Sequence, residues 1–176
     1  MNVNTAPLVE IQTLDKKALV DLYEELSPGL FRYAYRLLGS QELAEECVSE
    51  TFSRFLRALQ TGRGPSENVQ AYLYRMAHNW ITDQYRRKPQ LSLDGDLEQQ
   101  VDEHSNPSHL IADRLERERV RKAIMQLPFE QQRVIELRFL EELSHEEVAA
   151  ILGKSVEATR ALQYRALNAL RQWLTE

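Results

Sequence analysis

The chain has very little cysteine, with only Cys47 among 176 residues, and this excludes a disulfide framework within it. Cys47 falls in a helical stripe of apolar residues, so we expect a small buried hydrophobe rather than a nucleophile. The four histidines are scattered, and no group of Cys and His has the spacing of metal ligands. A Gly-rich phosphate loop and a recognisable Ser/His/Asp order are also missing. We therefore expect no enzyme, no metal site and no cofactor.

Long apolar runs, glycine and proline are scarce as well. No apolar run reaches the length that spans a bilayer, and the first residues lack the basic, apolar and small-residue regions of a signal peptide. We therefore expect a cytoplasmic protein without membrane insertion. Six glycines and six prolines in a chain of ordinary apolar content favour helices. The expected fold class is all-α.

The chain also lacks an excess of basic residues, because its formal net charge is −5. The deficit is local: residues 1–88 contain 11 basic and 11 acidic side chains, residues 120–176 contain 8 of each, and residues 89–119 contain 3 basic against 8 acidic. This distribution predicts two neutral units joined by an acidic connector. Since neither unit is strongly basic, we do not expect the chain alone to bind free DNA tightly.

Helical periodicity and capping residues predict three helices in the first third of the chain. Residues 1–13 are weakly patterned and are expected to form a frayed start. A first helix is predicted over 14–26, and Ser27 with Pro28 suits the start of a second helix that ends at Gly39. Ser40 suits the N-cap of a third helix over 41–59. The inward faces are predicted to hold Leu14, Ala18, Leu22 and Leu26 in the first helix, and Leu43, Cys47, Val48, Thr51, Phe55 and Leu59 in the third.

Two glycines and a proline mark residues 60–68 as a loop, and a fourth helix is predicted over 69–88. One side of this helix is mainly apolar and is predicted to hold Leu73, Met76, Ala77, Trp80 and Gln84. The other side mixes cations, amides and an aromatic ring, as a surface that follows a nucleic-acid strand would, although an ordinary solvated face fits the pattern equally well. Its members are Tyr72, Arg75, Asn79, Asp83, Arg86 and Arg87.

Residues 88–111 lose the helical period and gain Pro, Gly, Ser, Asn and acidic residues, so we place the domain boundary there. The predicted organisation is a helical domain at 14–88, an acidic flexible linker at 89–111 and a second helical domain at 112–175. The second domain is predicted to begin with helices over 112–127 and 128–141. The second of these two helices offers Phe129, Val134, Ile135, Leu137 and Leu140 for burial.

Residues 143–171 are predicted to form two helices around a tight turn. Ser144 and Glu147 make a capping box, Gly153 can end the first helix in a left-handed conformation, and Ser155 can cap the second. The second helix has an apolar stripe and a basic outer side, which predicts a helix-turn-helix that enters a DNA major groove; a solvated antiparallel hairpin is the alternative. The stripe comprises Thr159, Leu162, Ala166, Leu170 and Trp173, and the outer side comprises Arg160, Tyr164, Arg165, Asn168 and Arg171.

Three segments in chain order carry the motifs of one family: AEECVSETFSRFLRA, NVQAYLYRMAHNWITDQYRRK and LPFEQQRVIELRFLEELSHEEVAAILGKS. They resemble the second-region motif, the promoter-melting helix and the fourth region of an extracytoplasmic-function sigma factor of the sigma-70 family. The resemblance is to the minimal type, which has only the second and fourth regions, and it runs from about Leu22 to Leu174 outside the linker. It implies a subunit that binds core RNA polymerase and directs promoter recognition and melting.

The resemblance also assigns roles within the first domain. In the family, an acidic and polar helix face docks on the polymerase clamp, and this face maps onto Glu46, Ser49 and Glu50, where Ser49 replaces a frequent Gln. The loop at 60–68 and the helix after it are implied to receive the single-stranded −10 element, with bases flipped out of the stack. The implied contacts are Arg75, Asn79, Asp83, Arg86 and Arg87 in the helix, with Arg63, Ser66 and Asn68 in the loop.

The fourth region is implied to place its last helix in the major groove of the double-stranded −35 element. Arg160 and Arg165 match family positions that contact DNA, and Arg suits bidentate reading of guanine. Lys154 and Ser155 suit phosphate positioning at the helix N-terminus, and Tyr164 and Asn168 complete the candidate set. The chain has RALQ from Arg160 onward where many members have Lys-Ser-Arg-Leu, so their promoter specificity does not transfer to it.

The family resemblance also gives the acidic linker a role, because in the family this segment passes through the positive cleft of the polymerase. The side chains that could mimic a phosphate strand there are Asp94, Asp96, Glu98, Asp102 and Glu103, and a solvated tether is the alternative. The resemblance also implies an anti-sigma factor as a further partner, because members of the family commonly have one. Two other functions stay open: a sigma-like decoy that binds an anti-sigma factor without acting on promoters, and an autonomous helix-turn-helix regulator that binds a palindrome as a dimer.

Overall fold

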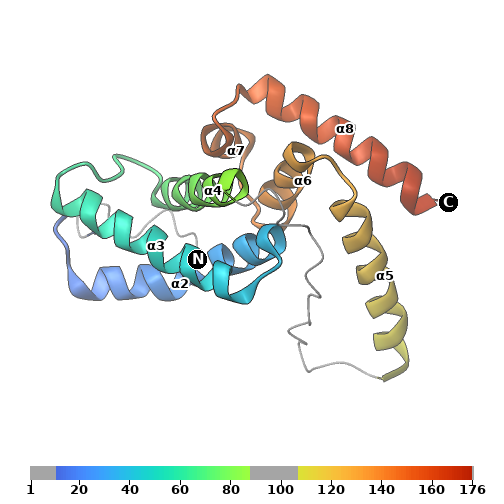
Figure 1. Cartoon of the computed structure of the whole chain (residues 1–176), viewed down its shortest axis with the longest axis horizontal. Coiled ribbons are helices and arrows are strands. Elements are labelled where there is room, and N and C mark those ends of the chain that lie inside the picture. The colour runs from blue at the N-terminus through green and yellow to red at the C-terminus, as the bar shows by residue number, and fades with distance from the viewer. Residues whose placement is uncertain (1–10, 88–106, 176) are drawn as a thin grey trace. The chain divides into compact units, whose positions relative to one another are not determined.

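The computed structural model describes residues 11–87 and 107–175, and these residues form helices and connecting turns without a strand (Figure 1). The predicted all-α class is therefore confirmed. The linker acids Asp94, Asp96, Glu98, Asp102 and Glu103 lie outside the described residues, so their role stays a prediction.

One long helix, α2 (Lys16–Leu38), replaces the two helices predicted before Gly39. Pro28 lies inside this helix and does not begin a new one. A proline inside a helix removes one backbone hydrogen bond and costs roughly 3 kcal/mol. The buried residues continue on one face on both sides of Pro28, from Leu22 to Leu37, and burial of that face offsets the cost.

The segment before α2 also differs from the prediction. Leu14, predicted to face inward, is 39% exposed and has a φ of 59°. It precedes the true cap, Asp15, whose carboxylate accepts a hydrogen bond from the amide of Ala18 at 2.9 Å. Ile11, in the segment expected to fray, is only 1% exposed. Burial in this part of the chain therefore reaches Ile11, which the sequence pattern did not predict.

Helices α3 (Gln41–Gln60) and α4 (Val69–Arg87) complete a packed group with α2. Ser40 caps α3 as predicted, because its hydroxyl accepts a hydrogen bond from the amide of Leu43 at 3.3 Å. The predicted inward stripe of α3 is confirmed except that Leu43 is only half-buried, and Ala44 and Phe52 are buried in addition.

Helix α4 is buried over a wider arc than its apolar pattern predicts. Leu73, Ala77 and Trp80 are buried as predicted, while Met76 and Gln84 are half-buried. The prediction missed that α4 packs against both α2 and α3, so a second set of its residues also points inward. This missed set comprises Tyr74, His78 and Ile81.

The C-terminal helices are α5 (Pro107–Met125), α6 (Phe129–Ile135), α7 (His145–Leu152) and α8 (Val156–Thr175). Helix α5 begins inside the range predicted as linker, with proline at the first helical position, where its missing N–H removes no helical hydrogen bond. A shared core joins α5, α6 and α8. Its buried members are Ala123, Leu127, Ile135, Ala166 and Leu170.

Two predicted core residues of this part are exposed. The helix predicted over 128–141 changes after Ile135 into a π-helix, η2 (Glu136–Leu140). This wider winding breaks the helical spacing that placed Leu140 inward, and Leu140 is 47% exposed. Trp173 is 37% exposed in the last turn of α8, beyond Leu170, the last buried residue of that helix.

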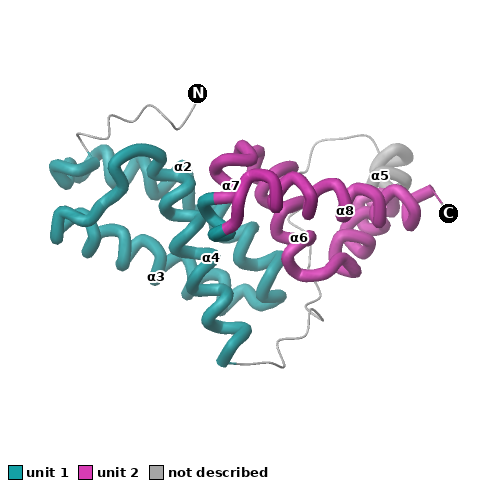
Figure 2. Tube along the Cα trace, turned by 90° about the horizontal axis from the view of Figure 1, so that it is seen from above, with its two compact units in different colours: residues 1–96, 150–153 teal, residues 97–149, 154–176 magenta. Residues whose placement is uncertain are grey.

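The chain divides into two compact units (Figure 2). We call residues 1–96 with 150–153 the first unit, and residues 97–149 with 154–176 the second unit. The first unit holds α2, α3 and α4, and the second holds α5, α6, η2, α8 and most of α7.

Candidate nucleic-acid interface

The turn between α7 and α8 is built from the local signals that the sequence contains. The hydroxyl of Ser144 accepts a hydrogen bond from the Glu147 amide at 3.1 Å, and the Glu147 carboxylate accepts one from the Ser144 amide at 2.6 Å. Gly153 has a φ of 63°, a left-handed conformation that a side chain would strain. Ser155 then caps α8 by accepting a hydrogen bond from the Ala158 amide at 3.1 Å. The predicted helix-turn-helix boundaries are confirmed.

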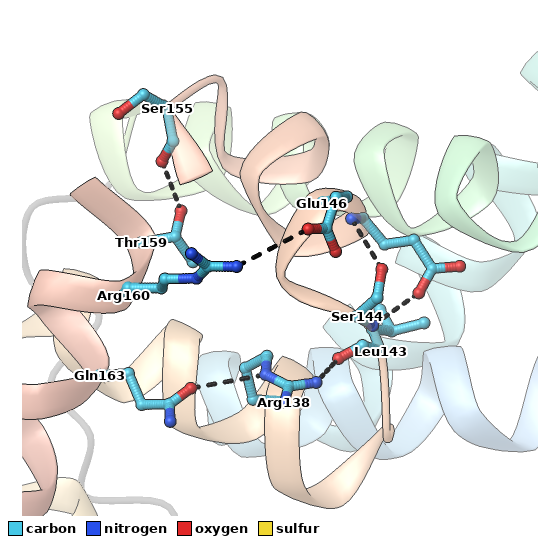
Figure 3. Close-up of polar contacts among 9 residues, drawn as sticks. Arg138, Leu143, Ser144, Glu146, Ser155, Thr159, Arg160 and Gln163 are labelled. Atoms are coloured by element: carbon cyan, nitrogen blue, oxygen red, sulfur yellow. Dashed lines mark hydrogen bonds and ion pairs between the residues drawn. The ribbon is translucent and has the colours of Figure 1, made fainter. Parts of the chain in front are cut away.

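Arg138, on η2, ties the segment before α7 to α8 (Figure 3). Its guanidinium donates to the carbonyl oxygen of Leu143 and, through Nε, to Oε1 of Gln163 at 3.4 Å. Since a guanidinium presents several donors in a rigid plane, one side chain can hold both acceptors. Arg138 therefore fixes the start of the helix-turn-helix against its second helix.

The outer side of α8 offers cations, an aromatic ring and an amide to solvent. Tyr164 is 69% exposed, and Arg160, Arg165 and Asn168 are exposed as well. Arg160 lies 4.0 Å from the carboxylate of Glu146, and both side chains are well exposed (Figure 3). An exposed pair at this distance contributes little to stability, so the Arg160 guanidinium can exchange this partner for another anion.

Two candidate phosphate contacts already have structural partners. The ammonium of Lys154 is 2.7 Å from the Glu130 carboxylate, and Lys154 is the less exposed member of the pair. Ser155 uses its hydroxyl as the cap of α8. An anion at this turn would therefore compete with Glu130 for Lys154.

Two ionisable side chains near the turn have shifted pKa values. Burial lowers the pKa of His145 below its usual range, and the nearby Arg138 and Arg160 cations lower it further, so the imidazole is neutral at pH 7. The pKa of Glu157 is lowered, first by a hydrogen bond from its own backbone amide and then by the Ser155 hydroxyl. Glu157 is thus held in its charged form at the N-terminus of α8.

A second exposed polar face runs along α4. Arg75, Asn79, Asp83 and Arg87 recur every four residues, so they follow one another along one side of the helix, and all four are exposed. Arg86 is exposed beside them, 3.8 Å from Asp83. The structure therefore brings together all of the predicted helix residues of the −10 set on one face.

The predicted loop residues do not share one environment. Arg63 and Ser66 are exposed, whereas Asn68 is half-buried. The Asn68 side chain accepts a hydrogen bond from the Ala71 amide at 2.9 Å and so caps α4. Tyr72, half-buried at the start of α4, donates from its hydroxyl to the Arg63 carbonyl at 3.3 Å.

The predicted polymerase-binding residues lie on α3. Glu46 and Ser49 are exposed, and Glu50 is half-exposed with its carboxylate 2.6 Å from Nε of Arg54. This face is therefore less negative than the three residues alone suggest, because Arg54 neutralises part of it.

Cys47 and the possible metal ligands of the described residues complete the survey of reactive groups. Burial raises the pKa of the Cys47 thiol to about 12, so it is a structural side chain in the thiol form. Within residues 11–87 and 107–175, no cluster of three or more His, Cys, Asp or Glu could hold a metal ion. None of the helices in the described part is long and apolar enough to cross a membrane.

Sequence reasoning missed Arg138 and gave Tyr72 no specific contact. Arg138 stands in a segment whose apolar pattern indicates burial, and the lone cation between Leu137 and Phe139 is the signal that could identify it. The contacts of Tyr72 depend on how the loop folds back on α4, which no local pattern encodes.

Two protein families match the chain: Sigma-70 region 2 at residues 22–89 and Sigma-70 region 4 at residues 123–172. The first match contains α4 whole, and the second contains α8 as far as residue 172. Each match thus covers one of the two exposed polar faces.

Among similar proteins, the ECF RNA polymerase sigma factor BldN of Streptomyces coelicolor is 30% identical over 158 residues, which are 88% of this chain and 60% of BldN. The ECF RNA polymerase sigma-E factor of Salmonella typhimurium is 33% identical over 174 residues, which are 93% of this chain and 90% of that protein. A solved structure of the sigma factor RpoE with the anti-sigma factor NepR from Bartonella quintana is 22% identical, with a TM-score of 0.70 over 90% of this chain and 98% of that chain. That structure supports the fold.

Proposed function

The chain belongs to the extracytoplasmic-function sigma factors of the sigma-70 family, and we propose that it binds core bacterial RNA polymerase and directs promoter recognition and melting. The observation that carries the proposal is the pair of exposed polar faces on α4 and α8, one in each family region. A chain with only one such face would lack a contact for the other promoter element.

We assign the −35 element to α8 and its turn. Arg160 and Arg165 are exposed and suited to guanine edges, where a good bidentate pair discriminates by roughly 1–3 kcal/mol. Tyr164 and Asn168 extend the same side of the helix. Lys154 and the N-terminus of α8, which Ser155 caps, would position a phosphate. Lys154 would then exchange the Glu130 carboxylate for the DNA phosphate.

We assign the single-stranded −10 element to the α4 face, which holds Arg75, Asn79, Asp83, Arg86 and Arg87, with Arg63 and Ser66 from the loop. Cations on this face would follow the backbone, and the amide and carboxylate offer hydrogen bonds to flipped bases. Asn68 contributes indirectly, because its side chain is engaged as the cap of α4.

We assign the polymerase clamp to Glu46, Ser49 and Glu50 on α3. Glu46 should contribute most, since its carboxylate is exposed, whereas the Glu50 carboxylate must first be released from Arg54. We also expect the protein to act in the cytoplasm and to catalyse no reaction. We expect an anti-sigma factor as its regulatory partner.

The deciding experiment measures whether the purified chain competes with a housekeeping sigma factor for core polymerase and yields promoter-specific transcripts. Binding with such transcripts supports the proposal. Binding without transcripts would favour the decoy, and tight DNA binding without polymerase would favour the autonomous regulator. The proposed factor alone should bind DNA weakly and with strong salt dependence.

Paired variants then separate the two surfaces. Arg160→Ala with Arg165→Ala should weaken promoter binding and spare polymerase binding. Arg117→Ala with Arg119→Ala, which removes two exposed charges from α5, is the matched control. Glu46→Ala with Glu50→Ala should do the reverse. Glu24→Ala with Glu25→Ala, which removes two exposed carboxylates from α2, is its control. Equal loss of both activities in every variant would contradict the assignment.

A further inference from the structure

The loop of residues 61–68, which joins α3 to α4, has one anchored side and one exposed side. Pro65 is buried, and a Cβ added to Gly64 would lie 2.6 Å from a methyl group of Leu59, so this part of the loop lies directly on the end of α3. Arg63 and Ser66, by contrast, expose their side chains. A loop that was merely a tether would not need such close contact with the helix.

Arg63 is held by its backbone at two points. Its amide donates to the carbonyl of Ala58 at 2.8 Å, near the end of α3. Its own carbonyl accepts a hydrogen bond from the Tyr72 hydroxyl at 3.3 Å, at the start of α4. The Tyr72 ring in turn packs near the buried ring of Phe55, with the two centroids 6.2 Å apart. The backbone of Arg63 is thus fixed from both helices while its guanidinium stays exposed.

A second side-chain hydrogen bond holds the loop, and it comes from a residue outside the two flanking helices. The side-chain amide of Gln12 donates to the carbonyl of Pro65 at 3.2 Å, across 53 residues of sequence. The next residue, Ser66, is exposed. Gln12 belongs to the segment before α2. A residue outside the candidate −10 face therefore helps to set the shape of the 61–68 loop.

We propose that Tyr72 and Gln12 are positioning residues that hold the 61–68 loop in the shape in which Arg63 and Ser66 meet the −10 element. This inference rests on the proposed function and adds the residues that set base selection through the loop. Its physical basis is preorganisation: a loop that is ordered before binding loses less conformational entropy when a base docks against it. Each hydrogen bond alone is modest, so the effects should be graded rather than complete.

Amide hydrogen exchange in the free, full-length protein tests whether the Tyr72 and Gln12 hydrogen bonds order the loop. Tyr72→Phe removes only the hydroxyl, and exchange within residues 61–67 should become about five-fold faster, the effect of one typical hydrogen bond. Tyr23→Phe makes the same chemical change on α2, where the ring packs on Phe52, and should leave the loop unchanged. Gln12→Glu should also accelerate loop exchange, whereas Gln41→Glu adds the same charge at the opposite end of α3 and should leave the loop unchanged. Unchanged exchange in Tyr72→Phe would overturn the proposal.

The role in base selection is tested with polymerase holoenzyme and a single-stranded −10 oligonucleotide that the wild-type holoenzyme has selected from a random pool. Tyr72→Phe should lower affinity for the selected sequence about five-fold and leave affinity for a scrambled sequence and for the −35 duplex unchanged. Because Tyr72 is proposed to act through the side chains of Arg63 and Ser66, adding Tyr72→Phe to the Arg63→Ala, Ser66→Ala double variant should lower affinity no further. A merely structural role would give additive losses, and additive losses would overturn the proposal.

The two arms also separate this inference from the proposed function. If the wild-type holoenzyme selects no −10 sequence, the proposed function is contradicted, and so is the role of Tyr72 and Gln12 in base selection. The exchange measurement would still show whether their hydrogen bonds order the loop. Faster loop exchange without a change in −10 preference would overturn the positioning role and leave the sigma-factor function intact.

Discussion

The first and second units support α4 and α8, the helices assigned to promoter DNA, by different means. In the first unit, α4 is enclosed by α2 and α3, which bury Tyr74, His78 and Ile81 as well as the expected apolar stripe. In the second unit, α8 buries a single stripe of four residues, and its turn is fixed by caps and by the Arg138 bridge. Burial thus dominates around α4, and polar end contacts dominate around α8.

This difference decides how freely each surface can vary. Most of the α8 circumference is exposed, so its outer residues can be exchanged without disturbing the core. The exposed face of α4 is narrow, and changes beside it reach buried side chains. Promoter-reading changes should therefore be tolerated better on α8 than on α4.

The chain offers a reporter for each side of the comparison. Of its two tryptophans, Trp80 lies buried in the first unit and Trp173 lies partly exposed in the second. In a Trp173→Phe background the fluorescence of Trp80 follows the first unit, and in a Trp80→Phe background that of Trp173 follows the second.

The largest expected effect is the loss of packing in the first unit. Phe55 is fully buried, and Phe55→Ala should lower the free energy of unfolding by about 3–5 kcal/mol through lost burial and the cavity left behind. Denaturant unfolding followed by Trp80 measures this effect. Leu56→Ala is the control, since Leu56 is exposed on the same helix and should cost far less. A Trp173 transition that moved equally would show one cooperative unfolding unit and break the comparison.

The next effect tests the buried polar pair of the first unit. The Tyr33 hydroxyl and Nδ1 of His78 form a buried hydrogen bond of 3.1 Å between α2 and α4. Tyr33→Phe leaves the imidazole nitrogen without this partner and should cost about 1–3 kcal/mol in the Trp80 transition. A loss no larger than that of Tyr23→Phe, at an exposed ring, would mean that His78 is satisfied without Tyr33.

The third effect concerns the capping box of the second unit. Ser144→Ala removes the hydroxyl that accepts from the Glu147 amide and should cost about 1 kcal/mol in the Trp173 transition. Ser144→Thr retains an accepting hydroxyl and should restore most of this stability. If Ser144→Thr were as unstable as Ser144→Ala, shape rather than the hydrogen bond would explain the preference for serine.

The same contrast explains which parts of the fold could be predicted. Ser40, Ser144, Ser155 and Gly153 act on amides or dihedral angles within a few residues, so their roles follow from the sequence alone. The error at Pro28 has the opposite origin. A local stop signal was overridden by a buried face that continues from Leu22 to Leu37.

In the candidate site, too, the features set by local sequence could be predicted, whereas contacts between separate elements could not. The faces of α4 and α8 follow from helical periodicity, and the family assignment from the motifs is confirmed by the two family matches. The Glu130 contact of Lys154 and the Glu146 contact of Arg160 could not be predicted, because each joins separate elements of the second unit. The DNA and polymerase roles of the individual side chains stay predictions.

The smallest expected effect tests whether Glu146 restrains Arg160. Glu146→Gln removes a carboxylate 4.0 Å from the Arg160 guanidinium and should tighten promoter binding by holoenzyme about two-fold, the scale of an exposed ion pair. Titration of a −35 duplex at low salt measures it, since screening reduces the effect at high salt. Glu142→Gln removes the same charge from the loop before α7 and is the matched control. In an Arg160→Ala background the gain should vanish; if it persisted, Glu146 would act through general repulsion of DNA, and the exposed ion pair would have no part in setting how α8 meets the promoter.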